Sequence, residues 1–376
     1  MMSITPDEAP VLVHRDGRVG RIVLNRPRAI NALNHVMVRR IDEALTAWER
    51  DDAVTAVVIT GAGERGLCAG GDIRAIHQDA LGIKAGTDRA GQTSADFWRA
   101  EYLLNARIAR YPKPYVAIMD GITMGGGVGI SAHGSVRIVT ERSIIAMPET
   151  GIGLVPDVGG TYLLARAPGE LGTHLALTSN SIGAADALLC GLADFFIPSD
   201  KLPQFAAALA ELTVEDAVHQ YAASAPAPAH ASEGGLAANQ EWIDACYAAD
   251  SVEEILERLL DSGEPAAKAA ADRIAGNAPT ALKVTLESLR RVRRFGVLEL
   301  ALDQEFRASC ASLPSADLLE GIRAQVIDKD RNPRWSPATL AEVTDQDVER
   351  YLAPIGDLEL GLEAGLTGLD QPSGSR

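Results

Sequence analysis

The chain has 376 residues, enough for one large domain or two of ordinary size around a substantial apolar core. Hydrophobic residues make up 47% and charged residues 23%, a globular composition that argues against a largely disordered or fibrous chain. Lys and Arg number 35 against 51 Asp and Glu, and the formal charge of −16 disfavours nucleic-acid binding, because a polyanion would be repelled.

The cysteines, the histidines and the amino terminus bear on the compartment and on metal binding. The four cysteines have no CxxC spacing, so neither a disulfide framework nor a zinc ribbon is indicated and a reducing compartment fits. They are Cys68, Cys190, Cys246 and Cys310. The seven histidines include no H-x-x-x-H pair, which gives no support for a metal site. The first residues lack a basic stretch followed by an apolar one, and the apolar runs end before the ~18 residues of a membrane span. We therefore expect a cytoplasmic protein that binds no membrane.

The first half of the chain predicts strands that alternate with helices. Residues 11–24 predict a β-hairpin around an Asp-Gly turn, and residues 31–50 have the one-sided apolar spacing of a helix. Residues 54–60 predict a strand that is buried on both faces, because they show no polar alternation. Two further short strands are expected at 115–119 and 136–139. This alternation predicts an α/β fold with parallel pairing.

Beyond about residue 200 the strand signals fade, and Ala, Leu and Glu favour helices. We expect a core over residues 1–200, a helical carboxy-terminal region over 201–354 and a flexible tail over 355–376. Residues 225–235 carry Pro and Gly without apolar periodicity, which is typical of a surface loop or linker.

Three local patterns suggest other functions. The sequence GAGERG (61–66) has the glycine spacing of a dinucleotide-binding turn, but further glycines replace the required helix and no second strand follows, so this reading is disfavoured. Ser131 in GISAHG lacks the spacing of a hydrolase elbow because position 133 is His, and both residues are interpreted as packed or surface helix residues. The basic run RRVRR (290–294) predicts either a solvated helix face or an anchor for ligand phosphates.

Two glycine-rich turns stand out, CAGGD (68–72) after one predicted strand and MGGGVG (124–129) after another. Each turn lets a ligand approach the backbone and leads into a helix whose first N–H groups are free. Two such turns side by side could form an oxyanion hole, in which backbone N–H groups stabilise the negative charge that develops on a carbonyl oxygen. From composition alone, tight packing turns explain the glycines equally well.

Two carboxylates lie in an apolar, Pro-containing loop further on, Glu149 and Asp157. Burial raises the pKa of a carboxyl group toward that of a useful general base or nucleophile. Either residue could instead cap a helix, and for Asp157, which precedes Val-Gly-Gly, a turn or N-cap role is the stronger alternative.

Taken together and in order, four motifs resemble the crotonase, or enoyl-CoA hydratase/isomerase, superfamily. They are NRPRAINALN (25–34), CAGGDI (68–73), MGGGVG (124–129) and PETGIGLVPDVGG (148–160). The resemblance implies a fold of repeated ββα turns with a helical carboxy-terminal region, which binds acyl-CoA and commonly assembles as trimers or pairs of trimers. By position, Gly71 and Gly126 match the two oxyanion donors of the family.

One departure from the hydratase pattern narrows the resemblance. Hydratases carry a second glutamate three residues after the second oxyanion glycine, where this chain has Gly129. The chain is instead similar to the 3-hydroxyisobutyryl-CoA hydrolases, in the motifs above, in FWRAEYLLN (97–105) and in EGIRAQVIDKDRNPRWSP (320–337). Carried over by position, the substrate-contacting residues of that subfamily are Glu101, Gly126, Glu149 and Asp157.

The resemblance implies hydrolysis of the thioester of a short 3-hydroxyacyl-CoA, with no cofactor beyond the CoA of the substrate. Glu149 would either attack the carbonyl carbon or activate a water molecule, Asp157 would orient Glu149 or the water or bind the 3-hydroxyl, and Glu101 would contact that hydroxyl. The implied CoA-binding residues are Arg28, Ala29, Ala69, Gly71, Asp72 and Ile73. For Asp72, capping of the following helix is the stronger interpretation. Two alternatives stay open: an enoyl-CoA hydratase or isomerase that uses Glu149 alone, and a catalytically silent acyl-CoA-binding subunit.

Overall fold

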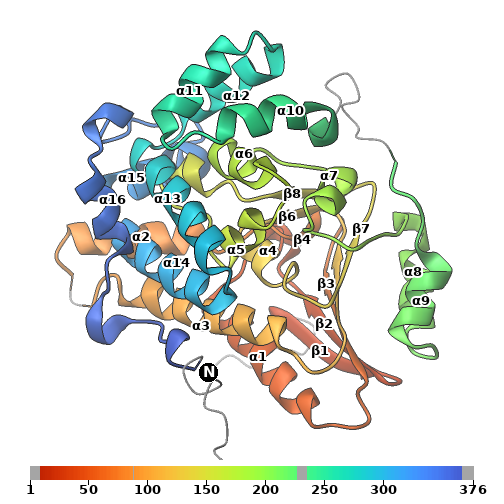
Figure 1. Ribbon diagram of the computed structural model, residues 1–376. Helices are drawn as coiled ribbons and strands as arrows, with labels where there is room; N and C mark the ends of the chain where they lie inside the picture. Colours follow the sequence, from red (N-terminus) through yellow and green to blue (C-terminus); the bar gives the residue numbers. More distant parts are fainter. Residues whose placement is uncertain (1–8, 88, 227–234, 366–376) are drawn as a thin grey trace, which may run out of the picture.

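The computed structural model describes residues 9–87, 89–226 and 235–365, and Figure 1 shows their arrangement. A six-stranded sheet has the order β1-β2-β3-β5-β7-β9, in which β1 and β2 pair antiparallel and the other pairs are parallel. Its strands are β1 (Val11–Asp16), β2 (Val19–Leu24), β3 (Ala56–Gly61), β5 (Tyr115–Met119), β7 (Val136–Val139) and β9 (Phe195–Phe196). The hairpin and the three expected inner strands are therefore confirmed, with β3 shifted toward the carboxyl end of its predicted range.

A second, three-stranded parallel sheet was not predicted. Its strands are β4 (Gly66–Cys68), β6 (Ile122–Met124) and β8 (Ile144–Ala146), in the order β4-β6-β8. Because the three strands are parallel, their carboxyl ends meet at one edge of the sheet. The two glycine-rich turns and the loop that carries Glu149 all leave from this edge.

Helices cover both sheets, and the helical character predicted for the second half is confirmed. The first helices are α1 (His35–Glu49), α2 (Ile73–Lys84), α3 (Gln92–Ala109), α4 (Gly126–Gly129), α5 (Gly160–Ala165), α6 (Leu171–Thr178) and α7 (Ala184–Leu189). The later ones are α8 (Leu202–Ala208), α9 (Val214–Tyr221), α10 (Gly235–Tyr247), α11 (Val252–Asp261), α12 (Pro265–Gly276), α13 (Pro279–Phe295), α14 (Leu298–Ser312), α15 (Ala316–Ile322) and α16 (Asp345–Leu352). A π-helical segment, Arg323–Ile327, follows α15 directly.

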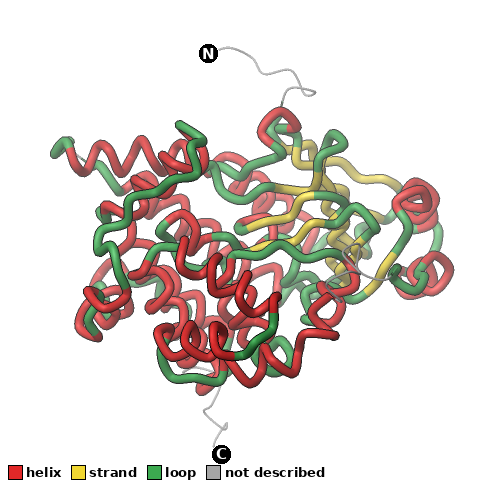
Figure 2. The backbone as a smooth tube through the Cα atoms, turned by 90° about the horizontal axis from the view of Figure 1, so that it is seen from above, coloured by secondary structure: helices red, strands yellow, loops and turns green. Residues whose placement is uncertain are grey.

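The six-stranded sheet separates two apolar layers. On one face α8 and α9 pack against the sheet through a small cluster that includes Val58, Ile138 and Phe205. On the other face a much larger cluster runs from Val11 to Leu360, so one core joins both halves of the chain. Seen from above in Figure 2, the strands gather on one side of the molecule and most helices on the other. The boundary predicted at residue 200 stays a prediction.

The tail predicted over residues 355–376 is wrong for its first part. Residues 355–365 pack against α3 and α14, where Arg99 donates a hydrogen bond to the carbonyl of Glu359 (2.9 Å) and Arg307 pairs with the carboxylate of Glu359 (2.9 Å). Leu360 is buried in the core. This packing could not be predicted from the sequence, because the anchoring arginines come from helices about 50 and 260 residues away. Residues 366–376, like 227–234 of the predicted loop, lie outside the described part.

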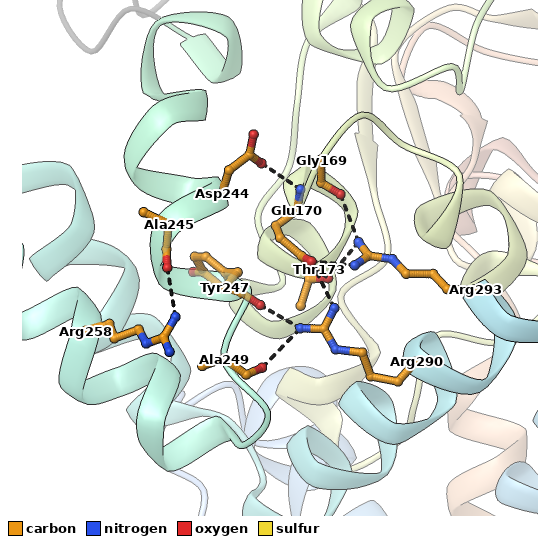
Figure 3. Close-up of polar contacts among 10 residues, drawn as sticks. All are labelled: Gly169, Glu170, Thr173, Asp244, Ala245, Tyr247, Ala249, Arg258, Arg290 and Arg293. Atoms are coloured by element: carbon orange, nitrogen blue, oxygen red, sulfur yellow. Dashed lines mark hydrogen bonds and ion pairs between the residues drawn. The ribbon is translucent and has the colours of Figure 1, made fainter.

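The basic run on α13 mostly makes ion pairs within the chain, as Figure 3 shows for two of its arginines. Arg290 (2.9 Å) and Arg293 (2.5 Å) both bind the buried carboxylate of Glu170, which precedes α6. Burial alone would raise the pKa of Glu170, but hydrogen bonds from Arg293 and other donors lower it. For these two arginines the solvated face is wrong, because both guanidinium groups pair with a buried carboxylate, whereas the phosphate anchor stays a prediction. Arg291 and Arg294 pair with Glu287 at the surface, which fits a solvated face.

Candidate active site

A cavity of about 480 Å³ opens at the carboxyl edge of the second sheet. Its wall is built from the turns after β4, β6 and β8, from α3 and from the helical carboxy-terminal half. Seven residues predicted as site residues line it: Ala69, Gly71, Ile73, Glu101, Gly126, Glu149 and Asp157. The parallel register of three short strands therefore brings together motifs that lie up to 88 residues apart in the sequence, from Ala69 to Asp157.

The two glycine turns bring Gly126 close to the backbone N–H group of Gly71. Gly71 forms a parallel bridge with Leu33, in which Leu33 N–H donates to the Gly70 carbonyl and Asp72 N–H to the Leu33 carbonyl, each at 2.8 Å. Because successive N–H groups of an extended segment point to opposite sides, the Gly71 N–H points away from Leu33. A Cβ at Gly126 would lie 3.3 Å from the Gly71 nitrogen. Within the described ranges, neither N–H has a hydrogen-bond acceptor, so both can bind a ligand oxygen.

Three carboxyl groups are buried in the same cavity: Glu101, Glu149 and Asp157 are only 2%, 5% and 5% exposed. Burial and the charge of Asp157 raise the pKa of Glu101 and of Glu149 well above the ordinary value. Burial raises the pKa of Asp157 to about 6. Each carboxyl is therefore a stronger base when ionised than it would be in water.

Two of these carboxyls keep an oxygen for a ligand. Among the described residues, Glu101 Oε1 and Glu149 Oε2 have no hydrogen-bond partner. Glu101 Oε1 lies so close to Gly126 that a Cβ there would displace the carboxyl, and Glu149 Oε1 lies 2.9 Å from where a Cβ at Gly125 would stand. Gly125 also has a φ of +48°. Because Gly125 and Gly126 have no side chains, the carboxyl groups of Glu149 and Glu101 can approach the N–H group of Gly126.

Asp157 is held by a tyrosine that the sequence analysis missed. Tyr102 Oη donates a 2.7 Å hydrogen bond to Asp157 Oδ2 and lies 2.8 Å from Ser309 Oγ on α14. Burial raises the pKa of Tyr102, which keeps its proton on the phenol. Asp157 does not cap α5, where Gly159 stands at the N-cap position without a side-chain bond. The N-cap alternative is therefore wrong, and the carboxylate faces the cavity.

Position 129 has no room for the second glutamate of the hydratase pattern. Gly129 ends α4, and a Cβ there would lie 2.6 Å from the Cβ of Val158 and 2.9 Å from Nδ2 of Asn105. Both neighbours are fully buried. The loop after Asp157 thus fills the space that a side chain at position 129 would need.

The predicted CoA residues divide into two groups. Ala69, Gly71 and Ile73 line the cavity, whereas Arg28 and Ala29 lie outside its wall on the short 3-10 helix Pro27–Ala29. The next residue, Ile30, accepts a hydrogen bond from Ala69 N–H (2.9 Å), so this helix lies beside the first glycine turn.

Asp72 occupies the N-cap position of α2, but its side chain caps nothing and pairs with Arg26 (2.9 Å). The capping interpretation is thus wrong for the side chain. The carboxy-terminal half supplies a part of the wall that the sequence did not reveal, in Arg273, Asn277, Gln325 and Val326.

Ser131 and His133 are structural, as interpreted. Ser131 Oγ donates to the Gly127 carbonyl (2.6 Å), and His133 Nε2 lies 2.8 Å from the Val158 carbonyl. All four cysteines are free. In the parts of the chain that the structure describes, no group of His, Cys, Asp or Glu has a metal-binding arrangement, and no helix is long and apolar enough to cross a membrane.

A model of the enoyl-CoA hydratase/isomerase family matches residues 19–352. The chain belongs to this family. The protein named 3-hydroxyisobutyryl-CoA hydrolase, mitochondrial, of Rattus norvegicus is 42% identical over 365 residues, which cover 96% of this chain and 92% of that protein.

Two solved structures resemble this family member throughout. A structure described as a carnitinyl-CoA dehydratase from Mycobacterium thermoresistibile is 53% identical, with a TM-score of 0.87, over 94% of this chain and 99% of that one. One described as an enoyl-CoA hydratase from Rhodobacter sphaeroides 2.4.1 is 44% identical, with a TM-score of 0.85, over the same shares. The expected crotonase-like α/β fold is confirmed, while the names of the relatives point to different reactions.

Proposed function

We propose that this chain is an acyl-CoA thioester hydrolase that cleaves 3-hydroxyisobutyryl-CoA into 3-hydroxyisobutyrate and CoA. The name of the rat relative, whose length the chain nearly spans, supports this reaction. The observation that carries the proposal is the filled space at Gly129, where Val158 and Asn105 exclude the second glutamate of the hydratase pattern. Glu149 is then the carboxyl beside the two N–H donors.

The first part of the mechanism is stabilisation of charge. In this mechanism the N–H groups of Gly71 and Gly126, which have no acceptor among the described residues, form an oxyanion hole that binds the thioester carbonyl oxygen. Addition at the carbonyl carbon moves negative charge onto this oxygen, and the two fixed donors stabilise it there without reorganisation. The loss of one such donor typically costs about 100-fold or more in kcat.

The second part is supplied by Glu149. Its ionised carboxylate either adds to the carbonyl carbon, giving an anhydride that water then hydrolyses, or takes a proton from a water molecule that adds directly. Both routes expel the CoA thiolate and need a carboxylate of high basicity. Burial, together with the negative charge of Asp157, provides this basicity by raising the pKa of Glu149.

The third part concerns the 3-hydroxyl of the substrate. Asp157, held by Tyr102, and Glu101, whose Oε1 has no partner among the described residues, offer acceptors on the wall of the same cavity. We assign the 3-hydroxyl to these two carboxyls. Arg28, Ala29, Ala69, Asp72 and Ile73 remain the proposed CoA contacts, and no further cofactor is required. The trimeric or hexameric assembly and the cytoplasmic location stay predictions.

A second candidate reaction is hydration or dehydration, which the descriptions of the two solved relatives name. It would have to proceed with Glu149 and without a carboxyl at position 129. A catalytically silent subunit is disfavoured, because three carboxyls whose pKa values are raised by burial are costly to keep together without a use.

Three thioesters distinguish these functions. The purified protein is given 3-hydroxyisobutyryl-CoA, crotonyl-CoA or carnitinyl-CoA, and free thiol and the ultraviolet absorbance of the conjugated thioester are followed. We expect thiol release from the first substrate and little change in conjugation with the other two. Rapid hydration of crotonyl-CoA, or loss of water from carnitinyl-CoA, with no thiol release from the hydroxyacyl thioester would contradict the hydrolase proposal. Tight binding without any reaction would support the silent subunit.

A further inference from the structure

The loop that presents Asp157 is fastened to α14 by a carboxyl group that does not line the cavity. Glu305 is 1% exposed. Its Oε2 accepts a hydrogen bond from Gly159 N–H (2.6 Å), and its Oε1 accepts one from Thr161 N–H (2.8 Å) and another from the Thr161 hydroxyl. Three donors from the residues just after Asp157 thus converge on one side chain.

The backbone of this loop needs such support. Val158 has a φ of +56° and Gly159 a φ of +79°. A β-branched residue is rarely stable in this region and persists where the surroundings fix it. His133 also holds the loop, and because a carbonyl can only accept, its Nε2–H donates to the Val158 oxygen (2.8 Å). Burial lowers the pKa of His133 to about 4, which keeps the ring neutral.

The two anchors connect the loop to different parts of the site. His133 follows α4, the helix that begins at the oxyanion residue Gly126. Glu305 belongs to α14, four residues before Ser309, whose hydroxyl lies 2.8 Å from the oxygen of Tyr102. The same face of α14 therefore supports Asp157 in two ways. Ser309 contacts Tyr102, which binds the Asp157 carboxylate, and Glu305 binds the backbone just after Asp157.

We propose that Glu305 is a positioning residue that fixes the Asp157 carboxylate against Tyr102 and the acyl end of the substrate. The inference rests on the proposed hydrolase function for its kinetic consequence. Glu305 itself does not contact the substrate. If its hydrogen bonds are broken, the strained loop relaxes, Asp157 moves, and the chemical step slows while CoA binding stays as it was.

The substitution Glu305→Gln tests this proposal. Both carboxyl oxygens accept from backbone N–H groups, so in either orientation the glutamine must turn its own NH₂ group toward one of these donors. The matched control is Asp303→Asn on the same helix. Asp303 is also buried and accepts two backbone N–H bonds, from Leu362 (3.0 Å) and Glu363 (2.8 Å), but it anchors the carboxy-terminal segment instead of the site.

For Glu305→Gln we expect kcat on 3-hydroxyisobutyryl-CoA to fall roughly tenfold or more, as a misplaced catalytic group does, with KM changed less than about threefold. Asp303→Asn should lower the melting temperature comparably and leave kcat within about twofold. Equal losses of kcat in the two variants, or a normal kcat in folded Glu305→Gln, would overturn the proposal. If Glu305→Gln does not fold, Thr161→Val decides, because it removes a single donor: a lower kcat at constant KM supports the proposal, and an unchanged kcat overturns it.

A crystal structure of Glu305→Gln separates this inference from the proposed function, because it requires no turnover. We expect the Asp157 carboxylate to move and its 2.7 Å hydrogen bond with Tyr102 to be lost or lengthened. An Asp157 in its original place would overturn the positioning role even if the wild-type enzyme is a hydrolase. A wild-type protein without thioesterase activity would overturn the proposed function but not a displacement seen in the crystal.

Discussion

The two sheets of this protein have different roles, because one forms the apolar core and the other positions the residues of the candidate active site. The six-stranded sheet has inner strands of four to six residues, packs apolar side chains on both faces and contributes none of its own strand residues to the cavity. The three-stranded sheet has strands of three residues each, yet the turns beyond its carboxyl ends hold Gly71, Gly126 and Glu149. A short parallel sheet thus aligns the three chain segments of the site, whereas the larger sheet is packed into the apolar core.

The largest effect is expected at the loop after β8. Glu149→Gln should lower kcat about 100-fold or more, because the amide keeps the shape of the side chain but is neither base nor nucleophile. The Kd for a non-hydrolysable acyl-CoA analogue, measured by calorimetry, should stay close to that of the wild type. A variant with near-normal kcat would remove Glu149 from the mechanism.

A smaller loss is expected after β6. In Gly126→Ala the new Cβ meets Glu101 Oε1 and comes within 3.3 Å of the Gly71 nitrogen, so the carboxyl must move and the space between the N–H donors narrows. We expect kcat to fall roughly tenfold or more. Gly183→Ala is the matched control, because no atom lies within 4 Å of its added Cβ. If both variants retain full activity in steady-state assays, the two N–H groups do not bind the carbonyl.

The pH dependence tests the buried acids. Activity requires ionised carboxyls, and burial raises the pKa of Glu149 well above its ordinary value and that of Asp157 to about 6, so kcat/KM should fall toward acid pH in a range that includes the pKa of Asp157. The hydrogen bond from Tyr102 lowers this pKa, so Tyr102→Phe should move the acid limb to higher pH and lower kcat/KM by a few fold at pH 7. An unmoved limb would show that Tyr102 does not act through Asp157.

The raised pKa of Asp157 has opposite effects on stability and on activity: activity falls toward acid pH, whereas this group's contribution to stability falls toward alkaline pH. The pKa of Asp157 is higher in the folded protein than its ordinary value of 3.8. The folded state therefore binds the proton more tightly than the unfolded chain, and this group's stabilising contribution, complete below about pH 4, is lost as the pH rises through about 6. The optimum of activity and this contribution to stability lie on different sides of that pKa.

The smallest effect on catalysis is expected in the large sheet. Ile138→Val on β7 removes one methylene from a fully buried side chain and should lower the free energy of unfolding by about 0.5–1.5 kcal/mol. Thermal melts should detect this change, while kcat stays within about twofold of the wild type. A loss of kcat similar to that of Gly126→Ala would mean that the two sheets do not have separate roles.

The parts of the site that could be predicted from the sequence are those that depend on residues close together in the chain. The glycines at 126 and 129 are needed because neighbouring side chains lie against their backbones, and Glu149 follows a proline in an apolar loop. The three-residue strands are too short for any periodicity, so the second sheet could not be predicted from hydrophobic pattern. Tyr102 and Glu305 read as ordinary helix residues, because their roles depend on contacts 55 and about 145 residues away in the chain.

The partner of Arg290 and Arg293 in the basic run could not be predicted for a related reason. The composition of the run resembles a phosphate site, but the partner Glu170 lies 120 residues earlier and becomes its neighbour only when α13 packs beside α6. Charge runs show where cations lie along a chain and not which anion meets them.

In this account the segments that follow β4, β6 and β8 converge on one thioester carbonyl, through Gly71, Gly126 and Glu149. A crystal structure of Glu149→Gln with 3-hydroxyisobutyryl-CoA bound tests it most directly. We predict that the thioester oxygen lies about 2.7–3.1 Å from the backbone nitrogens of both Gly71 and Gly126, with the carbonyl carbon facing residue 149. A thioester oxygen bound away from either nitrogen, or an acyl group outside this cavity, would contradict the account.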